Sequence, residues 1–297
     1  MTIGRERLMA ASFVVPAVVL IGLFVAWPTF NMFRVSLQDV TITAPDEALF
    51  SGVDNYVWLA RDAQFRASVI NTLLFTLLVV PLQTALALAF AIWANGPAWS
   101  SRTLRIVVFV PTVISLTVLS VLWRLMYAPA TATGAGLING LLETLHLPTQ
   151  PFLTSPKQAL VAMAIASIWQ GVGLQMMIFI AGLQHIPPHL HEAAMIDGAR
   201  RWRRFLNVTL PGIAPTAVFV LLITTIFALK LFVQPYIMTD GGGPQDATRS
   251  IVQHIYESAF FGRALGVASA AGVVLFVGVC VLMLAQKRFM QWAENLS

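Results

Sequence analysis

Six long apolar runs dominate this chain, and each is long enough to cross a lipid bilayer. A hydrocarbon core about 30 Å thick requires about 20 apolar residues for each helical crossing. The runs occupy residues 8–37 (a span to residue 28 with a helical tail), 69–94, 106–126, 159–183, 212–238 and 265–285. Backbone polar groups must be paired internally within lipid, so each run is expected to be helical. The sequence therefore predicts an all-α integral membrane protein with six transmembrane helices in a single domain, residues 1–297.

The overall composition agrees with a membrane protein. Of the 297 residues, 58% are hydrophobic and 10% are charged, whereas soluble domains carry about 25% charged residues. The formal net charge is +5, but the basic residues are divided among short loops, which does not indicate nucleic-acid binding. The single cysteine, Cys280, lies inside an apolar run and is expected to be a packing residue.

Lysine and arginine residues concentrate on one predicted side of the membrane. That side holds Arg5, Arg7, Arg102, Arg105, Arg200, Arg201, Arg203, Arg204, Lys287 and Arg288. The other side holds Arg61, Arg66, Lys157, Arg249 and Arg263, in longer loops. Because short cytoplasmic loops carry an excess of basic residues, both termini and residues 187–205 are predicted to face the cytoplasm. The expected location is the cytoplasmic (inner) membrane.

A polar segment with helix signals, residues 187–205, separates the fourth and fifth runs. Prolines at its start suit a first helical turn, and Glu192 lies near the positive end of the helix that follows. Asp197 and Gly198 interrupt that helix, and an arginine-rich helical stretch continues to Phe205. Two short helices joined at a glycine are predicted at the membrane surface. A simple amphipathic linker helix is the alternative.

This segment resembles the EAA motif of ABC-importer permeases. Glu192-Ala193-Ala194 is followed after three residues by Gly198 and after eleven more by Leu210-Pro211. Further matches to the carbohydrate-uptake subfamily, of which the maltose and glycerol-3-phosphate permeases are typical, cover nearly the whole chain. They include Asp197, Ala199, Phe205, Pro215, residues 52–56, Asn71-Thr72, residues 136–139, Trp169, Gly173, residues 181–183, and residues 239–244 with Thr248, where the turn has one extra residue.

The resemblance implies a type I importer permease core with a cytoplasmic coupling helix. In that family the helix docks on an ATPase subunit, a role that would fall here to Glu192, Ala193, Ala194, Asp197 and Gly198. The implied partners are a second permease in a heterodimer, two cytoplasmic ATPase subunits and an extracytoplasmic solute-binding protein. ATP and Mg²⁺ would be bound by the ATPases, with no cofactor on this chain. The implied process is carbohydrate import by alternating access.

The substrate path is expected near the membrane midplane, where polar groups are costly and usually functional. The resemblance places sugar contacts on the fourth and fifth spans. The polar candidates there are Gln170, Gln175, Lys230 and Gln234, and Trp169 and Phe227 could stack on a sugar ring. Gln83 and Arg124 are weaker candidates. For Lys230 the alternative is a snorkelling side chain, or one paired with the partner permease.

The sequence shows no catalytic, nucleotide-binding or metal-binding motif. The sequence contains no Gly-x-x-x-x-Gly-Lys-Ser/Thr loop and no Gly-x-Ser-x-Gly elbow. His185, His189 and His191 lack the cysteine or acidic residues that would complete a zinc site. The chain is therefore predicted to be neither an enzyme nor a metal protein. A secondary transporter driven by an ion gradient is the main alternative, but it would be expected to carry acids inside its spans. A membrane scaffold without transport is a third possibility.

Overall fold

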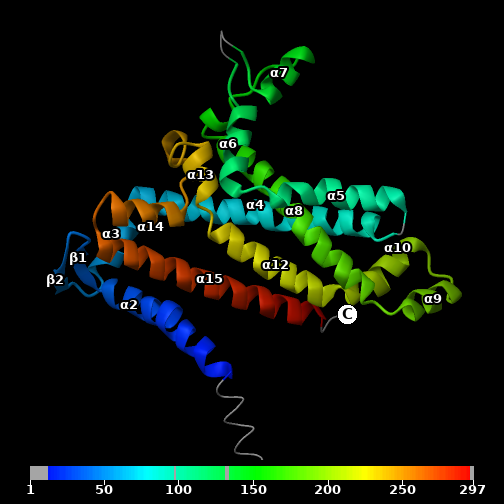
Figure 1. The fold of residues 1–297 in the computed structure, drawn as a ribbon, viewed down its shortest axis with the longest axis horizontal. Coiled ribbons are helices and arrows are strands. Elements are labelled where there is room, and N and C mark those ends of the chain that lie inside the picture. The colour runs from blue at the N-terminus through cyan, green and yellow to red at the C-terminus, as the bar shows by residue number, and fades with distance from the viewer. Residues whose placement is uncertain (1–12, 97, 131–133, 295–297) are drawn as a thin grey trace, which may run out of the picture. The chain divides into compact units, whose positions relative to one another are not determined.

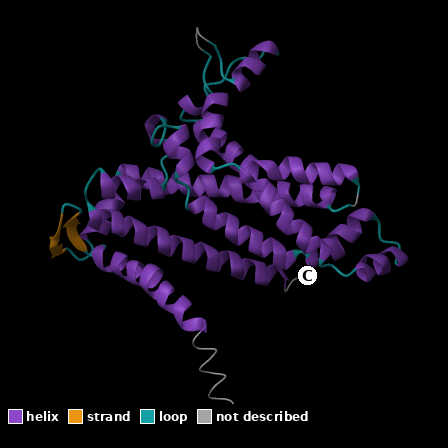
Figure 2. Ribbon diagram, in the orientation of Figure 1, coloured by secondary structure: helices purple, strands orange, loops and turns teal. Residues whose placement is uncertain are grey.

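The computed structural model describes residues 13–96, 98–130 and 134–294. Arg5, Arg7, both terminal ends and residues 8–12 of the first predicted span lie outside these described residues. Helices make up most of the described chain (Figure 2). Contacts divide the chain into two compact units, Met1–Asp62 with His254–Val277, and Ala63–Gln253 with Gly278–Ser297, which we describe separately. The single domain expected from the sequence remains a prediction.

The first unit combines membrane-type helices with a small hairpin (Figure 1). Its elements are η1 (Gly22–Ala26), α2 (Trp27–Val35), β1 (Gln38–Thr41), β2 (Ala44–Phe50), α3 (Asp54–Arg61), most of α14 (Ile251–Phe260) and the first part of α15 (Leu265–Glu294). The antiparallel hairpin, with Gln38 opposite Phe50, departs from the all-α prediction. Its first strand and turn are rich in β-branched residues, which favour extended backbone. Asn55 stabilises the start of β1 by donating hydrogen bonds to the Ser36 and Gln38 carbonyl oxygens, both at 2.9 Å.

The second unit contains most of the long helices. The long elements are α4 (Ala63–Ala94), α5 (Trp99–Val113), α6 (Leu116–Met126), α8 (Ala159–Gln184), α12 (Ala214–Leu229) and the end of α15. The short ones are α7 (Leu137–Thr144), η2 (Phe152–Thr154), α9 (Pro188–Ile196), α10 (Arg201–Arg204), η3 (Phe205–Thr209), α11 (Leu210–Gly212), α13 (Val233–Met238) and η4 (Pro244–Asp246). In Figure 1, α4, α5 and α8 lie side by side.

The predicted helical membrane fold is confirmed, but two spans are broken. In the described residues, Phe13–Val35, Ala63–Ala94, Ala159–Gln184 and Leu265–Arg288 are each long and apolar enough to cross a bilayer. Two further candidates are bent pairs, which bring the total to six: α5 with α6, bent by 100°, and the segment Arg201–Gly212 with α12, bent by 65°. The expected third span, 106–126, is therefore not one straight helix. Ile114 and Ser115 adopt extended backbone directly after the turn that contains Pro111.

Proline also explains two π-helical turns. The turn η1 ends two residues before Pro28, and η3 ends two residues before Pro211. A proline ring clashes with the carbonyl group four residues earlier, here that of Phe24 or Asn207, and each of these residues lies inside the π turn. In both places the π turn widens the helix by one residue at the carbonyl that the proline ring would otherwise meet.

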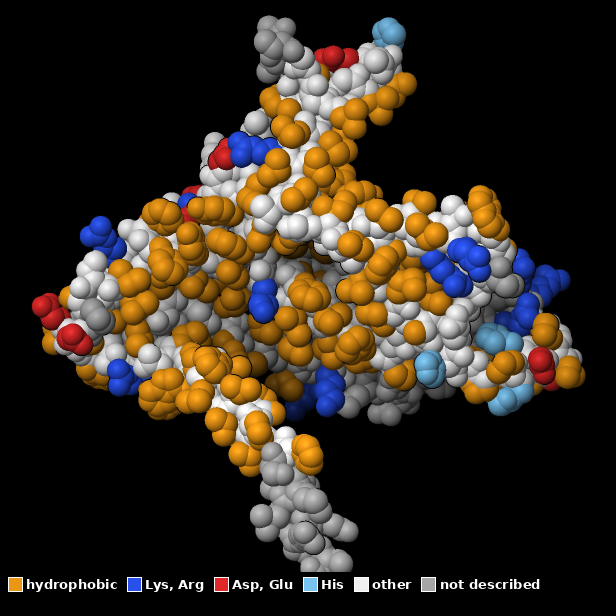
Figure 3. Space-filling model, in the orientation of Figure 1, with side chains coloured by type: hydrophobic (Ala, Val, Ile, Leu, Met, Phe, Trp, Pro, Cys, Tyr) orange, Lys and Arg blue, Asp and Glu red, His pale blue; other side chains and the backbone are white. Residues whose placement is uncertain are grey.

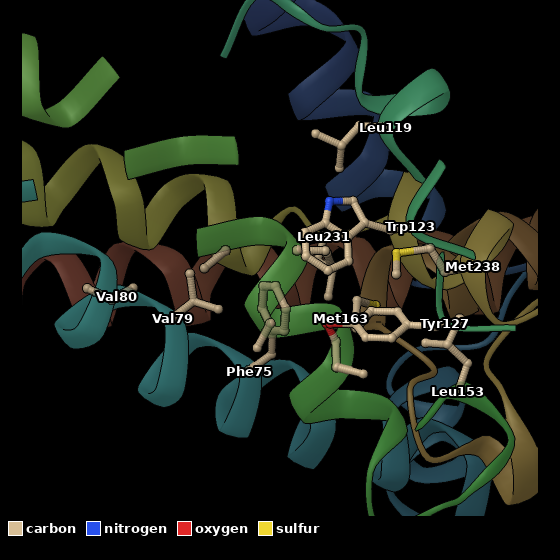
Figure 4. Packing of buried hydrophobic residues seen from close by; sticks show 14 residues of the cluster. Phe75, Val79, Val80, Leu119, Trp123, Tyr127, Leu153, Met163, Leu231 and Met238 are labelled. Atoms are coloured by element: carbon tan, nitrogen blue, oxygen red, sulfur yellow. The ribbon is translucent and has the colours of Figure 1, made fainter. Parts of the chain in front are cut away.

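The core of the second unit is built around α8. One cluster surrounds Phe75, Met163, Trp123 and Tyr127 (Figure 4). A second cluster contains small α4 residues against larger α8 side chains; its α4 members are Ala87, Ala91 and Ala94, all fully buried. Small residues allow helices to approach closely where no hydrophobic effect drives them together. Much of the remaining surface is apolar (Figure 3), as lipid-facing helices require.

Candidate functional site

The segment between α8 and α12 forms the predicted elbow. Pro187 precedes α9 and Pro188 is its first residue. The helix ends at Ile196, and Gly198 follows it with a φ of 72°. The Gly198 amide donates to the Met195 carbonyl at 3.0 Å, and the Ala199 amide donates to the Ala194 carbonyl at 2.9 Å. This pair of bonds is a Schellman motif, which a glycine in the left-handed region completes. The arginine-rich helix α10 follows it.

The elbow exposes both apolar and charged side chains. None of the α9 residues is buried, and Ile196 is 87% exposed. Glu192 and Asp197 are exposed and form no ion pair within the described residues. Figure 3 shows basic side chains, all arginines, gathered over α5 and α10, with histidines over α9. Apolar and charged side chains therefore share the exposed surface of the elbow.

The three histidines beside the elbow are not gathered into one cluster of ligands. Nδ1 of His185 lies 2.7 Å from the Ala181 carbonyl oxygen of its own helix. No group of three or more potential metal ligands occurs among the described residues.

A cavity of about 530 Å³ lies within the second unit, between α4, α8, α12 and α13 and the break between α5 and α6. Its volume is within the range of about 300–1,000 Å³ that is common for small-molecule sites. Five of the six predicted substrate-path residues line it, together with a weaker candidate: Gln170, Gln175, Phe227, Lys230, Gln234 and Gln83. The structure thus brings together residues that are more than 150 positions apart in the sequence, such as Gln83 and Gln234.

Two other candidates lie elsewhere. Trp169 does not line the cavity; its ring packs edge-on against Trp123, with ring centroids 5.7 Å apart. The guanidinium group of Arg124 donates two 2.7 Å hydrogen bonds to the Asp240 carboxylate and one of 3.0 Å to the Ile237 carbonyl. This bidentate pair fixes α6 to the end of α13.

The side-chain amides of the cavity are oriented by hydroxyl groups. The Thr224 hydroxyl donates to the Val220 carbonyl at 2.6 Å, so it can only accept a hydrogen bond from Gln175, whose Nε2 lies 2.5 Å away. The Gln175 Oε1 atom is then a buried acceptor without a partner in the described chain. Gln234 Nε2 similarly donates to the Ser167 hydroxyl at 2.7 Å. The fixed Gln175 amide, with its free acceptor, suits a ligand that carries hydroxyl groups.

Sequence reasoning missed several lining residues. Ser167, Gly171 and Thr224 all line the cavity. A side chain at Gly171 would collide with the Gln83 amide, so this glycine creates space. Helical periodicity could have found two of them, because Ser167 and Gly171 lie on the face of α8 that carries Gln170 and Gln175.

Lys230 is the one cationic side chain among the described residues that line the cavity, and no aspartate or glutamate lines it. Lys230 follows the last residue of α12, and its backbone amide donates to the Ile226 carbonyl at 3.1 Å. The side chain is exposed and forms no ion pair with another described residue.

The helical fold, the polar cavity and the exposed elbow together define a membrane permease. The chain matches the family described as "Binding-protein-dependent transport system inner membrane component" over residues 6–294, and it belongs to that family. It is therefore an inner-membrane permease component of an ABC transport system, and not an enzyme. This confirms the resemblance identified from the sequence.

Several characterised proteins are similar along nearly their whole length. The sulfoquinovosyl glycerol transport system permease protein SmoG of Agrobacterium fabrum is 32% identical, with 93% of this chain and 88% of that protein aligned. The lactose transport system permease protein LacF of Rhizobium radiobacter is 34% identical, with 94% and 91% aligned. The trehalose/maltose permease protein MalF of Thermococcus litoralis is 33% identical, with 92% and 90% aligned.

A solved structure shares the fold. A chain of a bacterial ABC transporter involved in the import of the acidic polysaccharide alginate superposes with a TM-score of 0.81 at 24% identity, covering 97% of this chain and 96% of that one. A second structure of the alginate transporter, in complex with a periplasmic protein that carries alginate pentasaccharide, gives a TM-score of 0.82 at 23% identity, covering 98% and 96%.

Proposed function

We propose that this chain is one of two permease subunits in an importer that carries a carbohydrate or sugar derivative across the cytoplasmic membrane by alternating access. The observation that carries this proposal is the cavity, which places fixed glutamine amides from separate helices around a space of ligand size. The relatives named above are permease proteins for sulfoquinovosyl glycerol, lactose, and trehalose or maltose. Phe227, 64% exposed at the cavity wall, offers a ring face for a sugar.

The proposed partners are a second permease, two cytoplasmic ATPases that bind Mg²⁺ and ATP, and an extracytoplasmic solute-binding protein. The elbow would transmit the ATPase cycle, through Glu192, Ala193, Ala194, Asp197 and Gly198. Its exposed apolar and acidic side chains support docking into a groove of a partner. The distribution of basic residues supports a cytoplasmic location for both termini and the elbow.

Reconstitution of the purified complex in liposomes tests the proposal. Uptake of a labelled sugar should require ATP on the ATPase side and the binding protein on the other. Uptake that needs only an ion gradient would favour the secondary-transporter alternative and refute the proposal. The described cavity wall contains no carboxylate that could carry a proton or sodium ion, which supports the ATP-driven mechanism.

The variant Glu192→Lys tests the coupling step. It reverses an exposed charge at the proposed docking surface and should abolish uptake while the protein still inserts and assembles in the membrane. Glu143→Lys is the matched control, because Glu143 is also an exposed helical glutamate but lies in α7, outside the elbow. Normal uptake by Glu192→Lys would remove this residue from the coupling surface.

A further inference from the structure

We infer that the transported sugar carries a negatively charged group, which Lys230 binds inside the cavity while the Gln175 oxygen accepts a hydrogen bond from a sugar hydroxyl. This inference rests on the proposed function, since it concerns the ligand of the same cavity. The chemical class is a sugar that bears a sulfonate, phosphate or carboxylate group.

The first observation is the uncompensated charge of Lys230. The Lys230 side chain is exposed and lines the cavity, so its ammonium group is accessible to a ligand there and attracts an anion. None of the described residues forms an ion pair with Lys230, and the cavity wall they build holds no acidic side chain. The negative end of α12 lies next to Lys230, but a helix end supplies only about half an elementary charge. The cavity therefore keeps a net positive charge that an anionic ligand would neutralise.

The second observation is the buried acceptor of Gln175. This side chain is 4% exposed, and its orientation is set by the Thr224 hydroxyl. The remaining Oε1 atom has no partner in the described chain. A buried acceptor is costly when left unpaired, so a ligand that donates a hydrogen bond gains from filling it. A hydroxyl group supplies this donor, whereas an anionic group without a proton does not.

Together, the two observations specify a ligand with an anion and a hydroxyl donor. Lys230 lies at the end of α12 and Gln175 lies on α8, so both helices would contact one molecule. A simple inorganic anion satisfies Lys230 but not Gln175. A neutral sugar satisfies Gln175 but leaves the ammonium charge uncompensated.

The test uses the complete transport complex in liposomes with its solute-binding protein. Uptake is measured for labelled sugars in pairs, an acid and its neutral counterpart in which the acidic group is replaced by a hydroxyl. The variants are Lys230→Gln, Lys230→Arg and Gln175→Leu. Lys157→Gln is the matched control, because Lys157 is an exposed lysine outside the cavity.

We expect ATP-dependent uptake of the acidic member of a pair. Lys230→Gln should reduce its initial rate about 10- to 100-fold, the range for losing a hydrogen bond to a charged group. Lys230→Arg should retain much of the rate, and Lys157→Gln should retain all of it. Gln175→Leu should slow uptake without changing the preference for the acid. ATPase stimulation by the loaded binding protein should persist in Lys230→Gln, which separates a ligand contact from a failure to assemble.

Three results would overturn the inference while leaving the proposed function intact. The first is ATP-dependent uptake of neutral sugars only. The second is uptake of an acidic sugar at an equal rate by the wild type and Lys230→Gln. The third is assembly that fails in Lys230→Gln but recovers when an acid on the second permease is substituted in compensation, which would assign the charge to subunit pairing. Failure of all ATP-dependent sugar uptake would instead refute the proposed function.

Discussion

Substitution of Gly198 by an uncharged residue should impair transport through backbone strain alone. This residue adopts a φ of 72° at the end of α9, and a Cβ atom placed there would meet nothing within 4 Å. A side chain therefore causes no clash, and the only penalty is the left-handed conformation, about 1–2 kcal/mol for an ordinary L-residue. Such a penalty changes the population of the folded elbow by a factor of about 5–30.

Substituting Gly198 by residues that tolerate the left-handed conformation to different degrees should reduce uptake by different amounts. Asparagine enters the left-handed region more easily than alanine, and a β-branched residue is disfavoured most. Uptake by the reconstituted complex should therefore decrease in the order Gly198, Gly198→Asn, Gly198→Ala, Gly198→Val. Gly198→Asp should abolish uptake for a second reason, because it adds a carboxylate beside Asp197 on the proposed docking surface.

Two measurements make the series decisive. ATPase activity should become partly independent of the loaded binding protein as the elbow loses its shape, while membrane insertion stays constant. Gly140→Val is the control, because Gly140 also has open space around its Cβ position but lies within the helix α7. Equal uptake by Gly198→Asn and Gly198→Val, whether normal or absent, would show that backbone conformation is not the reason for the glycine.

Three further predictions concern stability. Gly173→Ala should lower the thermal unfolding midpoint in detergent, because a Cβ atom there would collide with the Val108 carbonyl of α5. Overpacking of this kind typically costs about 1–3 kcal/mol. Gly278→Ala should leave the midpoint unchanged, because a Cβ atom at Gly278 meets nothing within 4 Å. Asn139→Ala should increase hydrogen exchange in α7, since it removes three hydrogen bonds that join this helix to Ala128 and Gln150; unchanged exchange would contradict this role. Burial raises the pKa of Tyr127 to about 12. The neutral Tyr127 side chain therefore contributes fully to stability below about pH 10, and this contribution is lost as the pH rises to 12. The variant Tyr127→Phe should lose less stability than the wild type over that pH range.

The membrane helices and the elbow could be predicted from the sequence because each depends on local information. Apolar length determines a span, and the elbow's prolines, glycine and arginines lie within a segment of 19 residues, 187–205. Breaks inside a span are harder to predict. Pro16, Pro81 and Pro111 all lie in apolar runs, but α4 continues through Pro81 while the chain bends by 100° soon after Pro111. Hydropathy does not distinguish these cases, because the neighbouring helices decide which freed backbone groups are paired again.

The cavity was predicted better for its charged and amide residues than for its aromatic ones. A glutamine or lysine inside an apolar run is costly in lipid, so its position alone indicates a polar interior. Trp169 carries no such signal, since an aromatic ring can lie against lipid, a second ring or a sugar, and here it packs against Trp123. The hairpin was missed because its strands follow a predicted helical tail, and because pairing between two short strands depends on contacts that composition does not show.

Two glycines of this permease, Gly173 and Gly198, allow coupling to be tested separately from folding. Gly173 has ordinary helical backbone and admits the close approach of α5 at Val108, Phe109 and Thr112, so its replacement should reduce the amount of folded protein. Gly198 has free space and a left-handed backbone, so its replacement should leave the membrane helices folded while it disturbs the elbow and reduces coupling. Comparing uptake per folded molecule in the two variants therefore tests the elbow directly: the Gly173→Ala value should remain near that of the wild type, whereas the Gly198→Val value should fall. If both values fell equally, the elbow would have no role distinct from the packing of the membrane helices.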